Sequence, residues 1–443
     1  MTRKADFVKP IRIYTILQFF GENVVTSEGI DYKRHRKRVA PRFGEKNNLL
    51  VFDQTKANVQ AMFDNWKNAY STETDGYLVD TNNEMMKLAL HVISSAAFGS
   101  KLDWEGDDKE VLKKNHKLSF KTTVEEVIEG LRLKILLPSI AYQLPFKSIQ
   151  RLKLVFDEFE SYLTELIDAA SDSNEANLLT SLVNASREET DGSGLSMSEL
   201  LGNIFIFMFA GHETTAATLT RALGLLALDP SKQHRLFEEI HQVTKGKDFT
   251  YKQLGEFCYT NAVMNETLRM FGPVITIPKQ CCGVQSAGKY TFSEDSRIDL
   301  HACAVHYNPK YWGPDPEAFR PERWFKLSEC AASASKTAEM LKISESGSAN
   351  EGSHEFQMLT YNRYAFIPFS EGVRSCLGKR FAQVEVITAL VLIVQNFTIH
   401  PSFGMKDTDV TESKNELTLQ SKKHIKLVFK PRFVRNSNDS VLQ

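Results

Sequence analysis

The sequence predicts a mainly α-helical protein with small β-sheets, and two patterns carry this prediction. Apolar residues recur every three or four positions through long segments, which is the spacing of one face of an α-helix. These segments lie at 57–69, 82–97, 149–169 and 196–228. Alternating apolar and polar residues, typical of strands, occur only in short runs near 289–292, 297–304 and 424–430. With 443 residues, 42% of them hydrophobic, the chain can bury a large core.

Charge and cysteine content narrow the class of protein. The formal net charge of -1 argues against a nucleic-acid binder, which usually carries a basic surplus. The six cysteines show no CxxC spacing and no regular framework, so we expect reduced thiols in a cytosol-facing compartment. No run of about 18 apolar residues would span a bilayer, and the first residues do not read as a signal peptide.

The first informative stretch is a basic helix. Residues 21–29 predict a turn, a short strand and a second turn, and a helix follows from about Asp31. It carries the run Tyr32-Lys-Arg-His-Arg36-Lys-Arg38. Such a run is either a solvated helix face or a docking surface for an acidic partner, and both interpretations stay open.

The centre of the chain predicts helices separated by prolines. Pro138 and Pro145 interrupt the pattern before the long amphipathic segment 149–169. We expect the aromatic residues of this region, such as Phe120, Phe146 and Phe156, to face the core rather than a ligand. Nothing here identifies a substrate.

The segment 196–228 predicts one long helix. Its start, Ser196-Met-Ser-Glu199, has the spacing of a capping box, and the helix would be about 48 Å long. Its middle reads Ala210-Gly-His-Glu-Thr-Thr215. Small residues let a flat group approach the backbone, and a carboxylate beside a hydroxyl in an apolar helix is costly unless it is used. The alternative is that Thr214 bonds its own helix carbonyl and Glu213 is exposed.

Two weaker signals follow. Glu266 and Arg269 are three residues apart on a predicted helix from about 254 to 271, so they share a face and can pair. Exposed pairs of this kind contribute little to stability. The segment 326–360 is rich in Ser, Ala, Glu, Lys and Gly and is predicted to be a flexible insertion.

The stretch Phe369-Ser-Glu-Gly-Val-Arg-Ser-Cys-Leu-Gly378 is the strongest candidate site. Gly372 and Gly378 flank Cys376 and suit a tight turn, since glycine takes positive φ without steric cost. A helix predicted from Lys379 would place its N-terminal dipole near the sulfur and favour the thiolate. A thiolate that binds haem iron indicates oxygen activation. The alternative is a buried structural thiol.

These motifs together resemble the cytochrome P-450 family, the haem-thiolate monooxygenases. The chain matches F-x-x-G-x-R-x-C-x-G, [A/G]-G-x-[D/E]-T-T, E-x-x-R and P-E-R-[F/W], the last at Pro321-Glu-Arg-Trp324, in the family's order. The resemblance covers nearly the whole chain and is closest to the microsomal type of filamentous fungi. It implies one mainly α haem-thiolate domain over residues 1–443, in which the family's N-terminal elements are missing.

The resemblance also implies roles for individual residues. Glu213 and Thr214 would be the acid and alcohol that relay protons, and Glu266, Arg269 and Arg323 would form a structural clamp. The cofactor is expected to be haem b, with its iron on Cys376. The residues expected around the haem are Tyr32, Arg36, Ala210, Gly211, Phe369, Arg374 and Gly378. Tyr32 stands where the family has a tryptophan that reaches a haem propionate, and a tyrosine can still donate one hydrogen bond from its ring.

The implied activity inserts one oxygen atom of O2 into a small apolar organic substrate. Electrons would come from NADPH through a separate flavoprotein reductase, because the sequence has no Rossmann glycine pattern or flavin region. The family type implies a monomer on the cytosolic face of the endoplasmic reticulum membrane. Two alternatives remain open: a haem-thiolate isomerase or peroxygenase that needs no reductase, and a non-catalytic haem-binding fragment.

Overall fold

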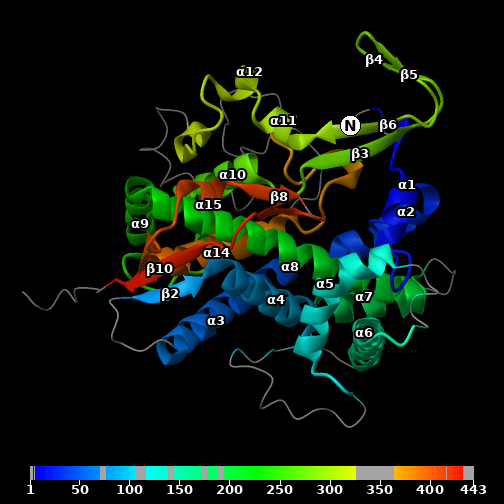
Figure 1. Ribbon diagram of the computed structural model, residues 1–443, viewed down its shortest axis with the longest axis horizontal. Coiled ribbons are helices and arrows are strands. Elements are labelled where there is room, and N and C mark those ends of the chain that lie inside the picture. Colours follow the sequence, from blue (N-terminus) through cyan, green and yellow to red (C-terminus); the bar gives the residue numbers. More distant parts are fainter. Residues whose placement is uncertain are drawn as a thin grey trace, which may run out of the picture. The chain divides into compact units, whose positions relative to one another are not determined.

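The protein is described by a computed structural model that is predominantly helical, with short strands (Figure 1). The structure describes residues 3, 5–69, 76–100, 102, 104, 116–137, 141, 144–171, 177–187, 194–325, 364–415 and 417–432. The predicted mainly α fold with small sheets is therefore confirmed. The predicted insertion at 326–360 lies outside the described residues.

The chain divides into two compact units. The first comprises residues 1–54, 89–213 and 278–300, and the second comprises 55–88, 214–277 and 301–443. The single domain over residues 1–443 stays a prediction, and the measurement that checks it is whether the chain unfolds in one cooperative transition.

Helices of the first unit pack around a cluster of phenylalanine rings. The ring of Phe20 lies 5.9 Å from Phe156, 5.3 Å from Phe159 and 5.2 Å from Phe205. The helices of this unit are α1 Ile11–Tyr14, η1 Thr15–Leu17, α2 Gly29–Val39, η2 Ala40–Arg42, α5 Phe120–Leu136, α6 Lys147–Ser171 and α7 Leu178–Arg187. The helices with residues in both units are α3 Glu45–Ala69, α4 Thr81–Phe98 and α8 Met197–Leu228.

A small sheet has the strand order β1-β3-β6, with β1 antiparallel to β3. Strands β4 and β5 form a separate antiparallel hairpin between β3 and β6 in the sequence. Their bounds are β1 Phe7–Val8, β3 Thr276–Cys281, β4 Gln285–Ala287, β5 Tyr290–Phe292 and β6 Arg297–His301.

The second unit has its core on helices α10 and α14, whose apolar residues are almost all buried. Its helices are α9 Pro230–Thr244, η5 Tyr251–Glu256, α10 Cys258–Phe271, α11 Ala302–His306, α12 Pro309–Trp312, η6 Pro321–Trp324, η9 Gly372–Arg374, α14 Lys379–Asn396 and α15 Asp407–Thr411. Its strands are β2 Tyr77–Asp80, β7 Phe397–Pro401, β8 Ser413–Asn415, β9 Leu419–Ser421 and β10 Lys426–Pro431. Strand β10, red in Figure 1, pairs antiparallel with both β2 and β7.

Three details differ from the expectations. No strand forms between residues 21 and 29, because the Asn23 side-chain oxygen accepts the backbone N–H groups of Val25 and Thr26 at 3.0 and 3.2 Å and so builds a turn. The helix expected at about 254–271 is broken at Phe257 into η5 and α10. Phe146 is 60% exposed, whereas Phe156 is buried, because Phe146 precedes the first turn of α6.

None of the helices within the described residues combines the length and the apolar character needed to cross a membrane.

Candidate functional site

The loop that carries Cys376 is closed by its own backbone. The Cys376 N–H donates to the Phe369 carbonyl at 2.9 Å, and the Ser375 N–H donates to the Gly372 carbonyl at 2.9 Å. Gly372 has φ 79°, the left-handed conformation that glycine adopts at little cost. Within this closed loop the Cys376 side chain is exposed, so the alternative of a buried structural thiol does not hold.

Gly378 behaves differently from the expectation. Its φ is -83°, an ordinary value, so the positive φ expected at both flanking glycines is wrong for this one. Gly378 is the N-cap of α14, and its carbonyl accepts the Ala382 N–H at 2.9 Å. The helix begins at Lys379 as predicted. Its first turn therefore follows Cys376 directly.

The Glu266 carboxylate lies at the centre of a buried cluster in the second unit. Both Glu266 and Arg269 are fully buried. Arg269 donates to the carboxylate through Nε and Nη2, each at 2.8 Å, in a bidentate pair. Arg323 Nε donates at 3.0 Å, and the Arg320 backbone N–H and Trp324 Nε1 donate at 3.0 and 3.1 Å. The carboxylate thus accepts five hydrogen bonds.

The remaining guanidinium nitrogens of the cluster bind backbone carbonyls. Arg269 Nη1 donates to the His306 carbonyl at 2.9 Å. Arg323 Nη1 donates to the Trp312 carbonyl at 2.7 Å, and Arg323 Nη2 contacts the Asp315 carbonyl. The structure therefore brings together the three residues that the motifs indicated, and it joins α10 to the segment that contains α11, α12 and η6.

Helix α8 is buried along most of its length, with one accessible stretch in the middle. Ala210 is exposed and Gly211 and Thr214 are partly exposed, positions that share one face of a helix. Glu213 is only 7% exposed, contrary to the alternative in which it faces solvent. The neighbouring His212 is buried, and burial lowers its pKa from 6.5 to about 4, so its ring is neutral near pH 7.

Gly211 has a packing reason that the sequence did not indicate. A Cβ atom at this position would lie 3.1 Å from Cδ1 of Ile93 on α4. The glycine therefore lets α4 pack closely against α8, independently of any flat group at this position.

Tyr32 and Arg36 lie one turn apart on α2 and contact each other. Arg36 Nη1 donates to the Tyr32 hydroxyl at 3.0 Å, and Tyr32 is 7% exposed. The structure therefore places the Tyr32 hydroxyl and the Arg36 guanidinium group next to each other on α2.

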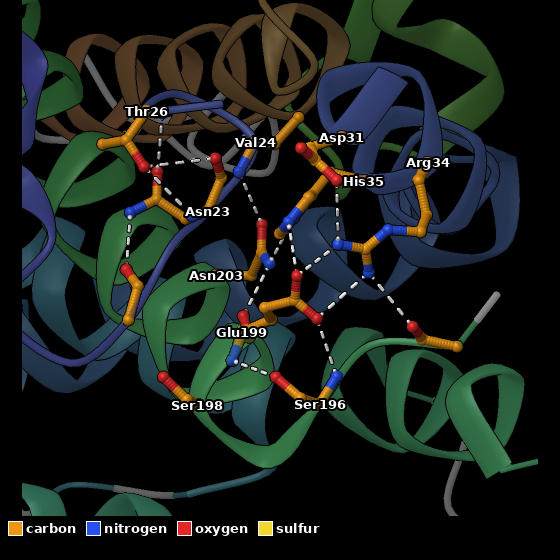
Figure 2. Close-up of polar contacts among 12 residues, drawn as sticks. Asn23, Val24, Thr26, Asp31, Arg34, His35, Ser196, Ser198, Glu199 and Asn203 are labelled. Carbon is orange, nitrogen blue, oxygen red and sulfur yellow. Dashed lines mark hydrogen bonds and ion pairs between the residues drawn. The ribbon is translucent and has the colours of Figure 1, made fainter. Parts of the chain in front are cut away.

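Helix α2 is held by the first turns of α8 (Figure 2). Ser196 and Glu199 form the predicted capping box, with N–H to side-chain distances of 2.8 and 3.2 Å. The same Glu199 carboxylate binds the Arg34 guanidinium at 3.0 Å. Asn203 accepts the Val24 N–H at 3.0 Å, and its amide group lies 3.0 Å from Nδ1 of His35.

These contacts divide the basic run of α2 into two groups. Arg34 pairs with Glu199, and Arg38 is 8% exposed. Lys33 and Lys37 are exposed and lie one turn apart. A docking surface on this helix therefore rests on these two lysines rather than on the whole run.

Comparisons with known proteins identify the family. The family model described as Cytochrome P-450 matches residues 2–429. Cytochrome P-450 monooxygenase 124 of Postia placenta is 34% identical, over 97% of this chain and 80% of the relative. Cytochrome P-450 monooxygenase AOL_s00215g278 of Arthrobotrys oligospora is 27% identical, over 97% and 79%. The solved haem domain of cytochrome P-450DA has a TM-score of 0.76 and 21% identity, over 97% and 85% of the two chains.

The chain belongs to the cytochrome P-450 family. It is a haem-dependent monooxygenase with fungal relatives, and its cofactor is haem b. The residues present fit this group in their chemistry. An exposed cysteine sulfur is a soft ligand suited to iron, while Arg36 and Arg374 offer guanidinium groups for carboxylates such as the propionates.

Proposed function

We propose that Cys376 is the thiolate ligand of the haem iron. The observation that carries this proposal is the exposed Cys376 side chain in a loop that its own N–H closes onto Phe369, directly before the first turn of α14. Unpaired N–H groups at a helix N-terminus stabilise negative charge, which supports a thiolate at this position. Phe369 and Gly378 frame the loop on its two sides.

We assign the haem propionates to Arg374, Arg36 and Tyr32. The guanidinium groups bind carboxylates through paired N–H donors. The contact between Arg36 Nη1 and the Tyr32 hydroxyl at 3.0 Å supports a joint role, because it holds the two polar groups next to each other on α2.

We assign the proton path to Glu213 and Thr214, and the face that receives the cofactor to Ala210 and Gly211. Bound haem b supplies the iron at which O2 is activated. The Thr214 hydroxyl holds water, and the Glu213 carboxyl takes up and releases a proton within reach of it. The accessible stretch of Ala210, Gly211 and Thr214 on an otherwise buried helix supports this assignment.

The electrons come from NADPH through a separate flavoprotein reductase, and the substrate is a small apolar organic molecule. The enzyme works as a monomer on the cytosolic face of the endoplasmic reticulum membrane. NADPH consumption that requires added reductase supports this reading, whereas turnover without any reductase favours the peroxygenase or isomerase alternative. Cell fractionation of a tagged chain tests the location.

The experiment for Cys376 uses the carbon monoxide difference spectrum of the reduced protein. The wild type and Cys282→Ser are expected to show the strongly red-shifted Soret band of a thiolate-ligated haem. Cys282 is the matched control, because it is also exposed. Cys376→Ser is expected to lose this band while the apoprotein stays folded by circular dichroism. A red-shifted band that survives in Cys376→Ser would disprove the assignment.

A further inference from the structure

His306 connects the Glu266 cluster to the segment that directly precedes the Cys376 loop. Its ring is 1% exposed, and its carbonyl accepts Nη1 of Arg269 at 2.9 Å. Its Nε2 lies 2.9 Å from the backbone nitrogen of Ile367, a residue 61 positions later in the chain. One residue therefore contacts both the clamp and the segment that leads to Phe369.

The Ile367 contact defines the tautomer of His306. A backbone N–H can only donate, so Nε2 must accept and carries no proton. The proton of the ring is therefore on Nδ1. Burial lowers the pKa of His306 from 6.5 to about 4, which keeps the ring in this neutral form near pH 7.

The segment before the loop is ordered by packing as well as by this bond. Ala365 is 1% exposed and Ile367 is 6% exposed. The Phe366 ring lies 4.6 Å from the Trp324 ring and 5.3 Å from the His306 ring. Trp324 is itself a donor to Glu266, so residues of the same cluster also pack against this segment.

Ile367 is fixed at both its polar groups. Its N–H binds His306, and its carbonyl accepts the Ser370 N–H at 3.0 Å. The loop that begins at Phe369 closes at Cys376 through the 2.9 Å bond between those two residues. Orientation of the Ile367 peptide group therefore sets how the chain enters the loop.

We propose that His306 is a positioning residue for the Cys376 loop, acting as a neutral acceptor that transmits the geometry of the Glu266 and Arg269 clamp to the Ile367 peptide group. This inference rests on the proposed role of Cys376. The positioning role requires an unprotonated Nε2 that accepts a hydrogen bond. A side chain of similar size or hydrophobicity at position 306 that lacks an acceptor does not replace it. Loss of the acceptor leaves a buried N–H without a partner, which is a strong reason for the segment to shift.

The test compares His306→Gln with His306→Met in the haem-loaded protein. The two side chains are similar in size, but only glutamine carries an oxygen that can accept the Ile367 N–H. We expect amide exchange of the peptide containing Ile367 to be at least about tenfold faster in His306→Met, together with a larger share of the blue-shifted carbon monoxide band. His306→Gln is expected to restore most of both properties.

The control is His116→Gln, which removes another buried histidine with two carboxylate contacts at 2.9 Å. It is expected to leave the ratio of the two carbon monoxide bands unchanged. If His306→Met and His306→Gln match each other in exchange and in band ratio, the positioning role is overturned. If the wild type itself lacks the thiolate band, the proposed function of Cys376 fails instead.

A direct measurement covers the case in which His306→Met does not fold. In protein labelled with 15N at histidine, the wild type is expected to show an unprotonated, hydrogen-bond-accepting Nε2 signal that is missing in His306→Gln. A protonated Nε2 at position 306 at pH 7 would overturn the inference.

Discussion

Glu266 concentrates five donors on one carboxylate that has no exposed surface. Three of the donors belong to two guanidinium groups, so one negative charge meets two positive charges around this carboxylate. A second carboxylate, that of Asp315, lies 3.6 Å from Arg323 Nη1, and the carbonyl groups of His306 and Trp312 also accept from the arginines. Such a cluster is stable only while all its members are present.

Replacing Glu266 is therefore expected to disrupt the second unit. Glu266→Gln puts an amide donor where Arg269 and Arg323 need an acceptor. Glu266→Ala leaves the two guanidinium groups without this carboxylate, and Arg269→Ala removes two of the five donors of the buried carboxylate. We expect each to lower the free energy of unfolding by about 3 to 5 kcal/mol and to lose haem with it. Urea unfolding and haem absorbance measure both.

The control for these variants is Glu238→Ala, which breaks an exposed pair between side chains that are 67% and 56% exposed. It is expected to change stability by less than about 0.5 kcal/mol. Stable, haem-loaded Glu266→Gln protein would contradict the role of the clamp.

His212 makes the protein sensitive to acid. Its pKa is lowered from 6.5 to about 4 by burial in the fold. Between these values the unfolded chain binds a proton and the folded chain does not, so stability falls as the pH drops. Between pH 7.5 and 5.0 this group accounts for a loss of about 2 kcal/mol. His212→Gln is expected to remove this part of the pH dependence of the free energy of unfolding, as measured by unfolding at the two pH values.

The matched control is His234→Gln, which removes a histidine that is 67% exposed and so tests whether the loss of any histidine has the same effect. An equal loss of stability with pH in the wild type and in His212→Gln would show that another group carries the effect.

At the residue scale the sequence predicted what local spacing can show. Glu266 and Arg269 are three residues apart in a helix, and their pairing follows from that spacing. The acceptor role of His306 depends on Ile367, 61 residues later, and no local pattern indicates it. Gly211 is similar, since its packing against Ile93 joins two helices that are distant in sequence.

At the element scale, helix α8 shows which features the sequence can predict. Its capping box and its end at Leu228 are read from adjacent residues, and the structure has both. Glu199 also binds Arg34, which lies 165 positions away in the chain, and no local pattern indicates that contact. The turn at Asn23 was also missed, because a side-chain oxygen there replaces the hydrogen bonds that a strand would need.

Helix α2 carries a prediction about electron transfer. Its two exposed lysines, Lys33 and Lys37, are the charges on which the hypothesis of an acidic reductase docking at α2 rests. We expect Lys33→Glu/Lys37→Glu to slow reduction by NADPH and reductase about tenfold at low salt, because charge complementarity sets the association rate. The difference is expected to shrink as salt rises. Stopped-flow formation of the carbon monoxide complex measures it.

Two comparisons make this prediction specific. Reduction by dithionite is expected to be unchanged, and Lys147→Glu/Lys153→Glu on α6, where both lysines are exposed, serves as the charge-matched control. Equal slowing by both double variants would indicate a general charge effect and no docking at α2.

At the scale of the whole molecule, the fold class was predictable and the strand partners were not. Helical periodicity runs through most of the chain, so a mainly α protein follows from the sequence. The β2 strand is four residues long, and its partner β10, which also pairs with β7, lies near the opposite end of the chain. Short strands carry too little pattern to indicate which of them pair.

The pairing of β2 with β10 also constrains how the protein is made. Asp80 contacts His424 at 2.8 Å across a sequence separation of 344 residues. During synthesis at about 5 to 20 residues per second, β2 leaves the ribosome roughly 20 to 70 s before its partner exists. Throughout that interval its backbone groups are an unpaired edge, open to other chains. Slower translation lengthens this exposure, so we expect the yield of folded protein to fall when translation is slowed.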